Sequence, residues 1–248
     1  FGDTLQTASV LASLYVVSGN AAQRRVQLKL AAAIGVEQSA YYRVTELYGD
    51  HIEGRVLHTP KLSAEKEQAI LDEILELNNK ATSSRFRYVY HALQHSIASQ
   101  NNNLSGALKA AESMLAIVLS SIPLNQRHNI GVCFALIGEI RLAQHDFIGA
   151  EASIEEALKY TIPDESNYTV RCHHLALALF FQNDYTKALG FIEAGIESAR
   201  NGNSFVRSKL ELTKAAIELV VGEPTKAYYT LQNTIELDQD KTEWNIAV

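Results

Sequence analysis

The stretch GEIRLAQHDFIGAEASIEEAL, residues 138–158, decides the fold because two similar stretches follow it in the chain. They are ALALFFQNDYTKALGFIEAGI, residues 176–196, and AAIELVVGEPTKAYYTLQNTI, residues 215–235. The starts of the three stretches are separated by 38 and 39 residues. A period of this length is typical of proteins built from stacked helical hairpins. The sequence therefore predicts a helical repeat.

The same residue types occupy the same places in each repeat. A short polar turn is followed by a residue that can open a second helix: Phe147, Tyr185 or Pro224. Three residues later stands an alanine: Ala150, Ala188 or Ala227. A large apolar residue and then a smaller one follow, namely Ile154 and Ala157, Ile192 and Gly195, or Leu231 and Thr234. Two antiparallel helices approach closely where small side chains meet and large ones fill the gaps, so each repeat predicts a helical hairpin.

This alternation resembles the second helix of the tetratricopeptide repeat (TPR), which has an alanine, a large apolar residue and a small residue at that spacing. The resemblance implies an all-α fold, an α-α superhelix (solenoid) of about six TPR-like helical hairpins. A single hairpin cannot cover its own apolar faces, so the hairpins must stack. Composition agrees, because 13 glycines and 4 prolines in 248 residues are too few to separate many strands and turns.

Weaker repeats are expected before residue 138. Helices near 84–99 and 104–121 extend the register, with Ala107 at the alanine position. A further helix is predicted over 63–78, with Ser63 as its N-cap. Near the N-terminus, four residues match the first-helix pattern of the family: Leu11, Ala12, Tyr15 and Gly19. We therefore expect degenerate helical hairpins in residues 1–80 and TPR-like repeats that form one continuous solenoid in residues 81–248.

Charge and hydropathy argue against two kinds of partner. The net charge is −6 and neither sign forms a long run, so no basic patch for a nucleic acid backbone is expected. Apolar runs such as residues 114–119 are far shorter than the ~20 residues that cross a bilayer, so no membrane partner is expected either. The chain opens with Phe1 and shows no signal sequence, so we expect an excised domain or a processed protein, with a cytoplasmic location.

Residues that could carry chemistry are scattered. His91 and His95 have a spacing that can bind a metal, but no third ligand is near them in sequence. His173 and His174 are adjacent and so point to different faces of a helix. No nucleophile elbow and no phosphate-binding glycine loop is present. We therefore predict no metal, no cofactor and no enzymatic activity.

The resemblance implies that the first helix of each repeat lines a concave groove. On this register, three first helices supply a mainly apolar set of groove residues: Glu139, Leu142, His173, Leu177, Phe181, Lys209, Leu212 and Ala216. The Lys and Asn residues with which many family members clamp a terminal carboxylate are not found at these positions, which disfavours a chaperone tail as ligand. An amphipathic helix or an extended peptide suits the groove better. For Phe180 and Phe181, packing between hairpins is the competing interpretation.

The leading hypothesis is a scaffold that binds a protein or peptide and has no catalytic activity of its own. The apolar strip could instead contact another copy of the chain, which leaves a homo-oligomer open. The alternative is the sensor or regulatory domain of a peptide- or ligand-responsive signalling protein or transcription factor, with its effector domain outside this chain. An enzyme built on a solenoid is a third hypothesis, and no motif favours it.

Overall fold

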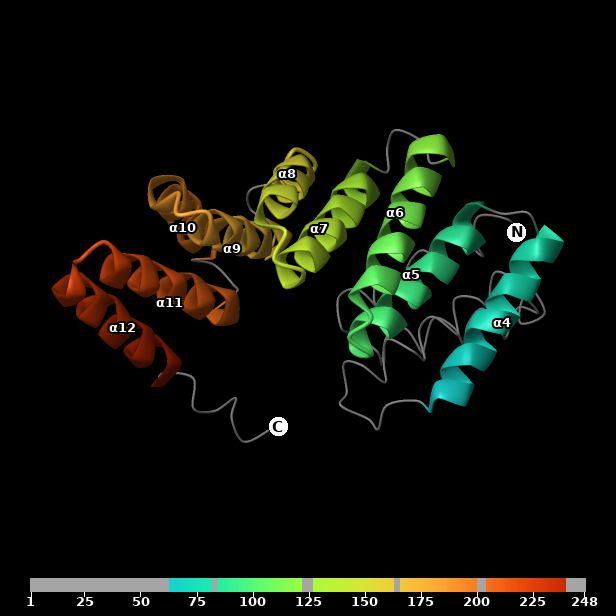
Figure 1. Ribbon diagram of the computed structural model, residues 1–248, viewed down its shortest axis with the longest axis horizontal. Helices are drawn as coiled ribbons and strands as arrows, with labels where there is room; N and C mark the ends of the chain where they lie inside the picture. The colour runs from blue at the N-terminus through green and yellow to red at the C-terminus, as the bar shows by residue number, and fades with distance from the viewer. Residues whose placement is uncertain (1–62, 82–83, 122–126, 163–165, 200–203, 240–248) are drawn as a thin grey trace, which may run out of the picture. The chain divides into compact units, whose positions relative to one another are not determined.

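Figure 1 shows a computed structural model of the chain, which describes residues 63–81, 84–121, 127–162, 166–199 and 204–239. The regular elements in these ranges are nine α-helices that follow one another as hairpins. The all-α prediction is thereby confirmed. The predicted first hairpin, near residues 11–19, lies outside the described residues. No helix in the described ranges has both the length and the hydropathy that a membrane span requires.

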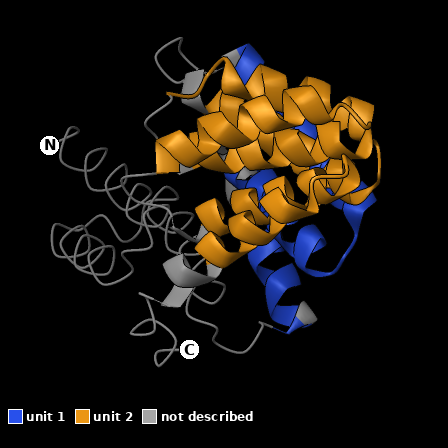
Figure 2. Ribbon diagram, turned by 90° about the vertical axis from the view of Figure 1, so that its left-hand side faces the viewer, with its two compact units in different colours: residues 1–121 blue, residues 122–248 orange. Residues whose placement is uncertain are grey.

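The chain divides into two compact units, residues 1–121 and residues 122–248 (Figure 2). The border between the units is at a different place from the one expected at residues 80 and 81. That residues 81–248 form one continuous solenoid stays a prediction, and the two units are described separately below.

The first unit contains the described helices α4 (Ala64–Ala81), α5 (Ser84–Gln100) and α6 (Leu104–Ser121). Ser63 caps α4 as predicted, because its Oγ accepts the backbone N–H of Lys66 at 3.4 Å. Leu71 and Ile74 of α4 pack with Leu93 of α5 in a small apolar core. This core joins α4 to the hairpin that follows it.

Helices α5 and α6 form the hairpin that the register predicts upstream of residue 138. Asn102 in the turn has a left-handed backbone with a φ of 55°, which asparagine tolerates better than most residues. The Oδ1 of Asn103 then accepts the backbone N–H of Gly106 at 3.0 Å and caps α6. Ala107 is fully buried, as the alanine position requires.

The second unit contains three hairpins, each with a first and a second helix. They pair α7 (Arg127–Ala143) with α8 (Phe147–Leu158), α9 (Ser166–Phe181) with α10 (Tyr185–Ala199), and α11 (Ser204–Val220) with α12 (Pro224–Gln239). The second helices begin at Phe147, Tyr185 and Pro224, as the repeat predicted.

The three hairpins share one turn. His145, Asn183 and Gly222 occupy the same place in it, with left-handed φ values of 62°, 64° and 84°. In each turn the next residue donates its N–H to a carbonyl five residues earlier, as Asp146 does to Arg141 at 2.9 Å. This pattern satisfies carbonyls that the end of a first helix would otherwise leave unpaired. The shared turn explains why the hairpin boundaries follow the sequence repeat so closely.

Small residues lie where the helices of these hairpins meet. The repeat alanines Ala150, Ala188 and Ala227 are fully buried. Gly138 of α7 faces α8, and a Cβ at this position would lie 2.5 Å from the Cγ1 of Ile154. Large residues from successive hairpins then fill a single apolar core, which includes Ile154, Leu175, Leu179, Ile192, Leu210 and Ile217.

The packing order explains which surface the first helices share. Each second helix contacts the next first helix, α8 with α9 and α10 with α11. The first helices also contact one another, α7 with α9 and α9 with α11. The first helices α7, α9 and α11 therefore lie next to one another in the second unit, and we expect them to share one surface.

Candidate functional site

The eight predicted groove residues all belong to the three first helices of the second unit. Glu139 and Leu142 lie on α7. The next helix, α9, carries His173, Leu177 and Phe181, and α11 carries Lys209, Leu212 and Ala216. Because α9 contacts both of the other helices, its three residues occupy the middle of the surface.

Phe181 is the large aromatic residue that this surface exposes most clearly. Its side chain is 53% exposed although it stacks on Phe147 of α8, with ring centroids 4.7 Å apart and planes 15° apart. Phe180 meets it edge-on at 5.2 Å. Phe180 itself is half-buried and packs against the core beside Tyr185. Phe180 therefore packs against the core within its own hairpin, whereas Phe181 packs on the preceding hairpin and keeps about half of its side chain exposed.

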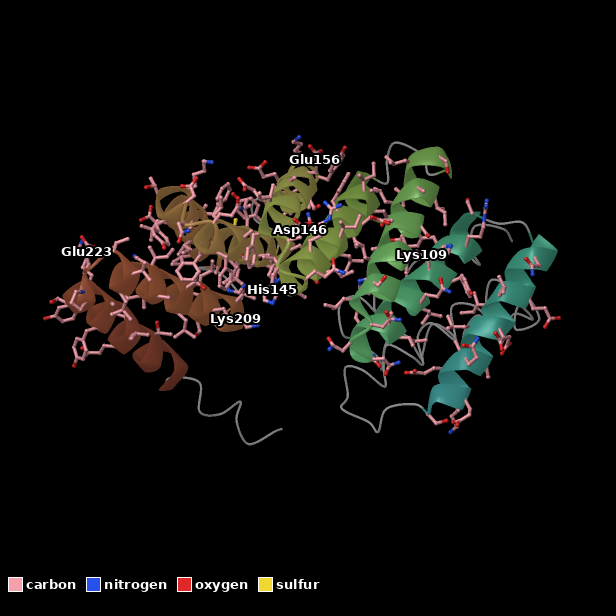
Figure 3. The ribbon with its side chains drawn as sticks, in the orientation of Figure 1. Lys109, His145, Asp146, Glu156, Lys209 and Glu223 are labelled. Atoms are coloured by element: carbon pink, nitrogen blue, oxygen red, sulfur yellow. The ribbon has the colours of Figure 1, made fainter. Side chains whose placement is uncertain are left out.

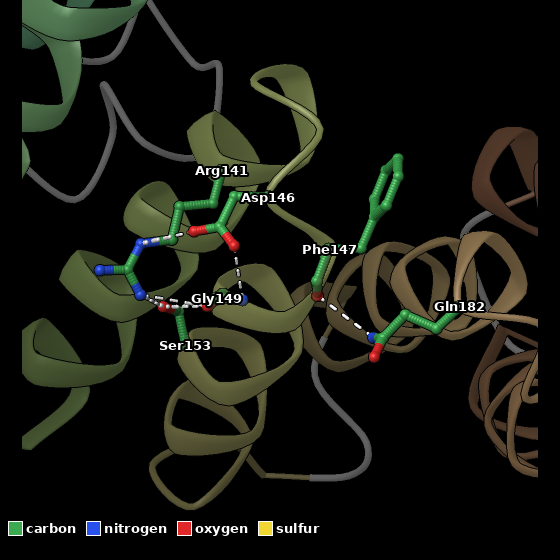
Figure 4. A network of polar contacts seen from close by, with 6 residues as sticks. All are labelled: Arg141, Asp146, Phe147, Gly149, Ser153 and Gln182. Carbon is green, nitrogen blue, oxygen red and sulfur yellow. Dashed lines mark hydrogen bonds and ion pairs between the residues drawn. The ribbon is translucent and has the colours of Figure 1, made fainter.

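Gln182 fixes the end of α9 on the start of α8 (Figure 4). Its Nε2 donates to the backbone carbonyl of Phe147 at 3.3 Å and to the Oε2 of Glu151 at 2.7 Å. Gln182 thus directly follows one member of the stacked pair, Phe181, and bonds the backbone of the other, Phe147. The orientation of the Phe181 ring is therefore set by contacts within the chain before any ligand arrives.

The other apolar candidates differ in how far they reach the surface. Leu212 of α11 is 51% exposed, while Leu177 and Ala216 are half-buried. Leu142 is half-buried and packs against the core, so part of its role is structural. Exposed apolar area is thus contributed chiefly by Phe181 and Leu212, with Leu177 four residues before Phe181 on the same helix.

The polar candidates connect the three first helices. The Nδ1 of His174 lies 3.4 Å from the Oε1 of Glu139 on α7. On the other side of α9, the Nε2 of His173 lies 3.5 Å from the Oγ1 of Thr213 on α11. The two histidines therefore point to different neighbours, as their adjacency predicted. Sequence reasoning selected His173 for the groove and missed His174, whose contact with Glu139 depends on how two hairpins stack.

Burial governs the charge of both histidines. It lowers the pKa of His173 to about 4, with further lowering by the neighbouring His174 and Lys209. It also lowers the pKa of His174, against an opposing effect of Glu139. Both imidazoles are therefore neutral at neutral pH, and the contact of His174 with Glu139 joins a neutral imidazole to a carboxylate. Lys209 of α11 (Figure 3) is exposed, and its charge helps to lower the pKa of both histidines.

An arginine inside the first of these hairpins has a structural role that the sequence did not reveal. The Nη1 of Arg141 donates to the carbonyl of Gly149 at 3.1 Å and to the Oγ of Ser153 at 2.8 Å (Figure 4). Its Nε lies 3.9 Å from Asp146, which also caps α8 through the N–H of Gly149. Arg141 thus joins α7, the turn and α8.

The residues considered for chemistry are engaged in ordinary packing where the structure describes them. The Nδ1 of His91 hydrogen-bonds the Oε1 of Gln94 at 2.8 Å. Cys133 and Cys172 are buried free thiols, and burial raises the pKa of Cys172 to about 11. Within the described ranges, no group of three or more His, Cys, Asp or Glu side chains is arranged to hold a metal ion.

Comparison with known proteins defines the class of fold. No protein-family model and no curated protein matches the sequence. Among solved structures, apo RapI matches with a TM-score of 0.69 and 11% identity over 98% of this chain and 73% of that chain. The PilF protein of Pseudomonas aeruginosa matches with a TM-score of 0.58 and 14% identity over 98% of both chains. MamA matches with a TM-score of 0.57 and 9% identity over 78% of this chain and 96% of its own.

These neighbours are TPR proteins, and identities this low establish a shared fold alone. The chain has the TPR-type fold, an α solenoid of stacked helical hairpins. The resemblance read from the repeat is confirmed at the level of the fold.

Proposed function

We propose that this chain is a TPR-like scaffold that binds an apolar segment of a protein or peptide, and that it has no catalytic activity of its own. The binding surface is formed by the first helices α7, α9 and α11. The observation that supports it best is the exposure of two large apolar side chains, Phe181 and Leu212, on adjoining first helices. Exposed apolar side chains of this size on adjoining helices are typical of interaction sites.

Preorganisation strengthens this interpretation. The ring of Phe181 is held between Phe147 and Phe180, and Gln182 holds the helix end that carries it. A ligand that packs on Phe181 therefore does not have to order the side chain first, which lowers the entropic cost of binding. Aromatic anchors of this kind often contribute much of the affinity of an interface.

The ligand that fits best is an amphipathic helix or an extended peptide with apolar residues. Leu177 and Phe181 would contact its apolar side, with Leu212 and Ala216 of α11 beside them. Glu139, His173 and Lys209 supply hydrogen-bonding and charged groups around the apolar strip. Since Lys209 is exposed, its charge is expected to affect association rate more than final affinity.

A peptide library displayed on phage tests the proposal and does not require the native partner. Peptides selected on the parent chain are expected to contain closely spaced apolar residues. A Leu177→Ala, Phe181→Ala double variant should bind them at least tenfold more weakly by fluorescence anisotropy, since losing an anchor costs about 2 kcal/mol or more.

The matched control is Ile148→Ala, because Ile148 is 74% exposed on α8 and outside the proposed surface. It should bind the peptides with the parental affinity. Circular dichroism must first show that the double variant keeps the parental helix content. If the folded double variant binds as tightly as the parent, the surface is assigned wrongly.

A further inference from the structure

The side of α12 that a following hairpin would cover is exposed. The decisive position is the residue directly after the repeat alanine. In α8 this residue is Glu151, whose Oε2 accepts a hydrogen bond from Gln182, the residue directly after α9. In α10 it is Leu189, which packs against the core to which α11 contributes Leu210. In α12 the same position is Tyr228, and its side chain is 64% exposed.

Two more side chains are more exposed than their counterparts in the preceding hairpins. Leu219 of α11 is 54% exposed, whereas its counterparts Leu142 and Phe180 are half-buried against the core. Leu231 of α12 is half-buried, whereas Ile154 and Ile192 at its place are fully buried. We name Leu219, Tyr228 and Leu231 the end face. In the two preceding hairpins, the counterparts of these residues pack in or against the core, or hydrogen-bond to the next hairpin as Glu151 does.

The neighbouring charges leave the end face suited to a copy of itself. Glu218 is buried and accepts the hydroxyl of Thr230 at 2.8 Å. Glu223, at the turn between α11 and α12, pairs with Lys226 at 2.7 Å (Figure 3). Both carboxylates already have partners within their own chain. When two end faces approach each other, repulsion between the carboxylates of the two copies is therefore weak.

We propose that the end face binds the end face of a second copy of this chain, related by a two-fold axis. Such a contact uses the same patch on both copies, so its apolar and tyrosine residues must be self-complementary. Packing of hairpin on hairpin is what the second unit already uses between α9–α10 and α11–α12. The contact uses none of the eight predicted groove residues, although Leu219 of α11 occupies the repeat position of the groove residue Leu142.

The size of the end face limits how strongly two copies can associate. Two helices of about 17 residues form a layer about 25 Å long and 20 Å wide, which gives on the order of 500 Å² for each copy. The pair then reaches only the ~1,000 Å² at which specific interfaces begin. We therefore expect weak association, as is common at the low end of specific interface sizes.

Sedimentation equilibrium of the whole chain, from ~1 to several hundred µM, tests this directly. The parent is expected to pass from monomer to dimer over this range. Tyr228→Glu should raise the dissociation constant at least tenfold, because it places like charges at the centre of the contact. Leu219→Ser should weaken the dimer in the same direction without adding a charge.

The matched control is Tyr229→Glu. Tyr229 is 60% exposed and adjacent to Tyr228. Its repeat counterparts Ala152 and Gly190 are exposed even though another hairpin follows theirs, so this position lies outside the contact between hairpins. Tyr229→Glu should therefore dimerise like the parent. A parent that stays monomeric at the highest concentration overturns the proposal, whether or not it captures another protein. Equal effects of Tyr228→Glu and Tyr229→Glu also overturn it.

Discussion

Gly138 of α7 and Ile154 of α8 approach so closely that a methyl group on Gly138 would lie 2.5 Å from the Cγ1 of Ile154. Both residues are buried in the middle of the hairpin. A contact this short exists only because one partner has no side chain. The small residue that opens each sequence repeat therefore has a direct packing function in this hairpin.

Gly138→Ala is expected to destabilise the chain. Helix propensity alone would favour alanine by about 1 kcal/mol, but overpacking a tight contact costs about 1–3 kcal/mol. Gly190→Ala is the matched control, because a Cβ at that position meets no atom within 4 Å. Urea unfolding should show a lower free energy of unfolding for Gly138→Ala and a higher one for Gly190→Ala. Equal values for the two variants would contradict the packing.

Ala188→Arg is expected to be severely destabilising. Ala188 is fully buried between helices, so a guanidinium there loses its hydration without gaining a partner, at a cost on the order of 3 kcal/mol or more. Ala188→Gly should cost about 1 kcal/mol through helix propensity. Ala152→Arg, at an exposed position of α8, should melt like the parent. Thermal melting that finds Ala188→Arg as stable as Ala152→Arg would show that the repeat register is wrong.

Acid is expected to weaken the fold through His173. Its pKa is about 4 in the folded chain and near 6.5 when unfolded, so the unfolded chain takes up the proton first as the pH falls. The stability that a neutral His173 contributes is complete above pH ~6.5 and is lost between ~6.5 and ~4.

His173→Gln should therefore make the free energy of unfolding less dependent on pH across that window. Urea unfolding of the parent and the variant at several pH values isolates this contribution, because the carboxylates titrate in both proteins. If the two curves stay parallel from pH ~6.5 to ~4, proton uptake by His173 is not coupled to unfolding.

Much of the fold could be predicted from the sequence because the hairpin is a local structure. The turn position shared by His145, Asn183 and Gly222, and the alanine positions such as Ala188, follow from short-range geometry that repeats along the chain. The boundaries of the second helices were right for this reason. The helix from Ala64 was also predicted, although it ends at Ala81, three residues later than expected.

The candidate site was less predictable because it depends on how successive hairpins stack. Phe180 and Phe181 have the same side chain, so the sequence does not show which of them is exposed. Their surroundings differ only in the folded chain, where Phe180 contacts Tyr185 and Phe181 stacks on Phe147. His174 was missed because Glu139 belongs to a helix 35 residues earlier in the chain. Ligand binding by the eight groove residues stays a prediction, as do the cytoplasmic location and the regulatory alternative.

Photo-crosslinking from the surface itself tests the central claim most directly. Benzoylphenylalanine is placed at position 181 in one variant and at position 148 in another, since both side chains are exposed but only Phe181 belongs to the proposed binding surface. The measurement is the yield of covalent adduct with a peptide selected on the parent chain. We expect an adduct at position 181 that unlabelled peptide competes away, and none above background at position 148. An adduct at position 148 without one at position 181 would contradict the claim.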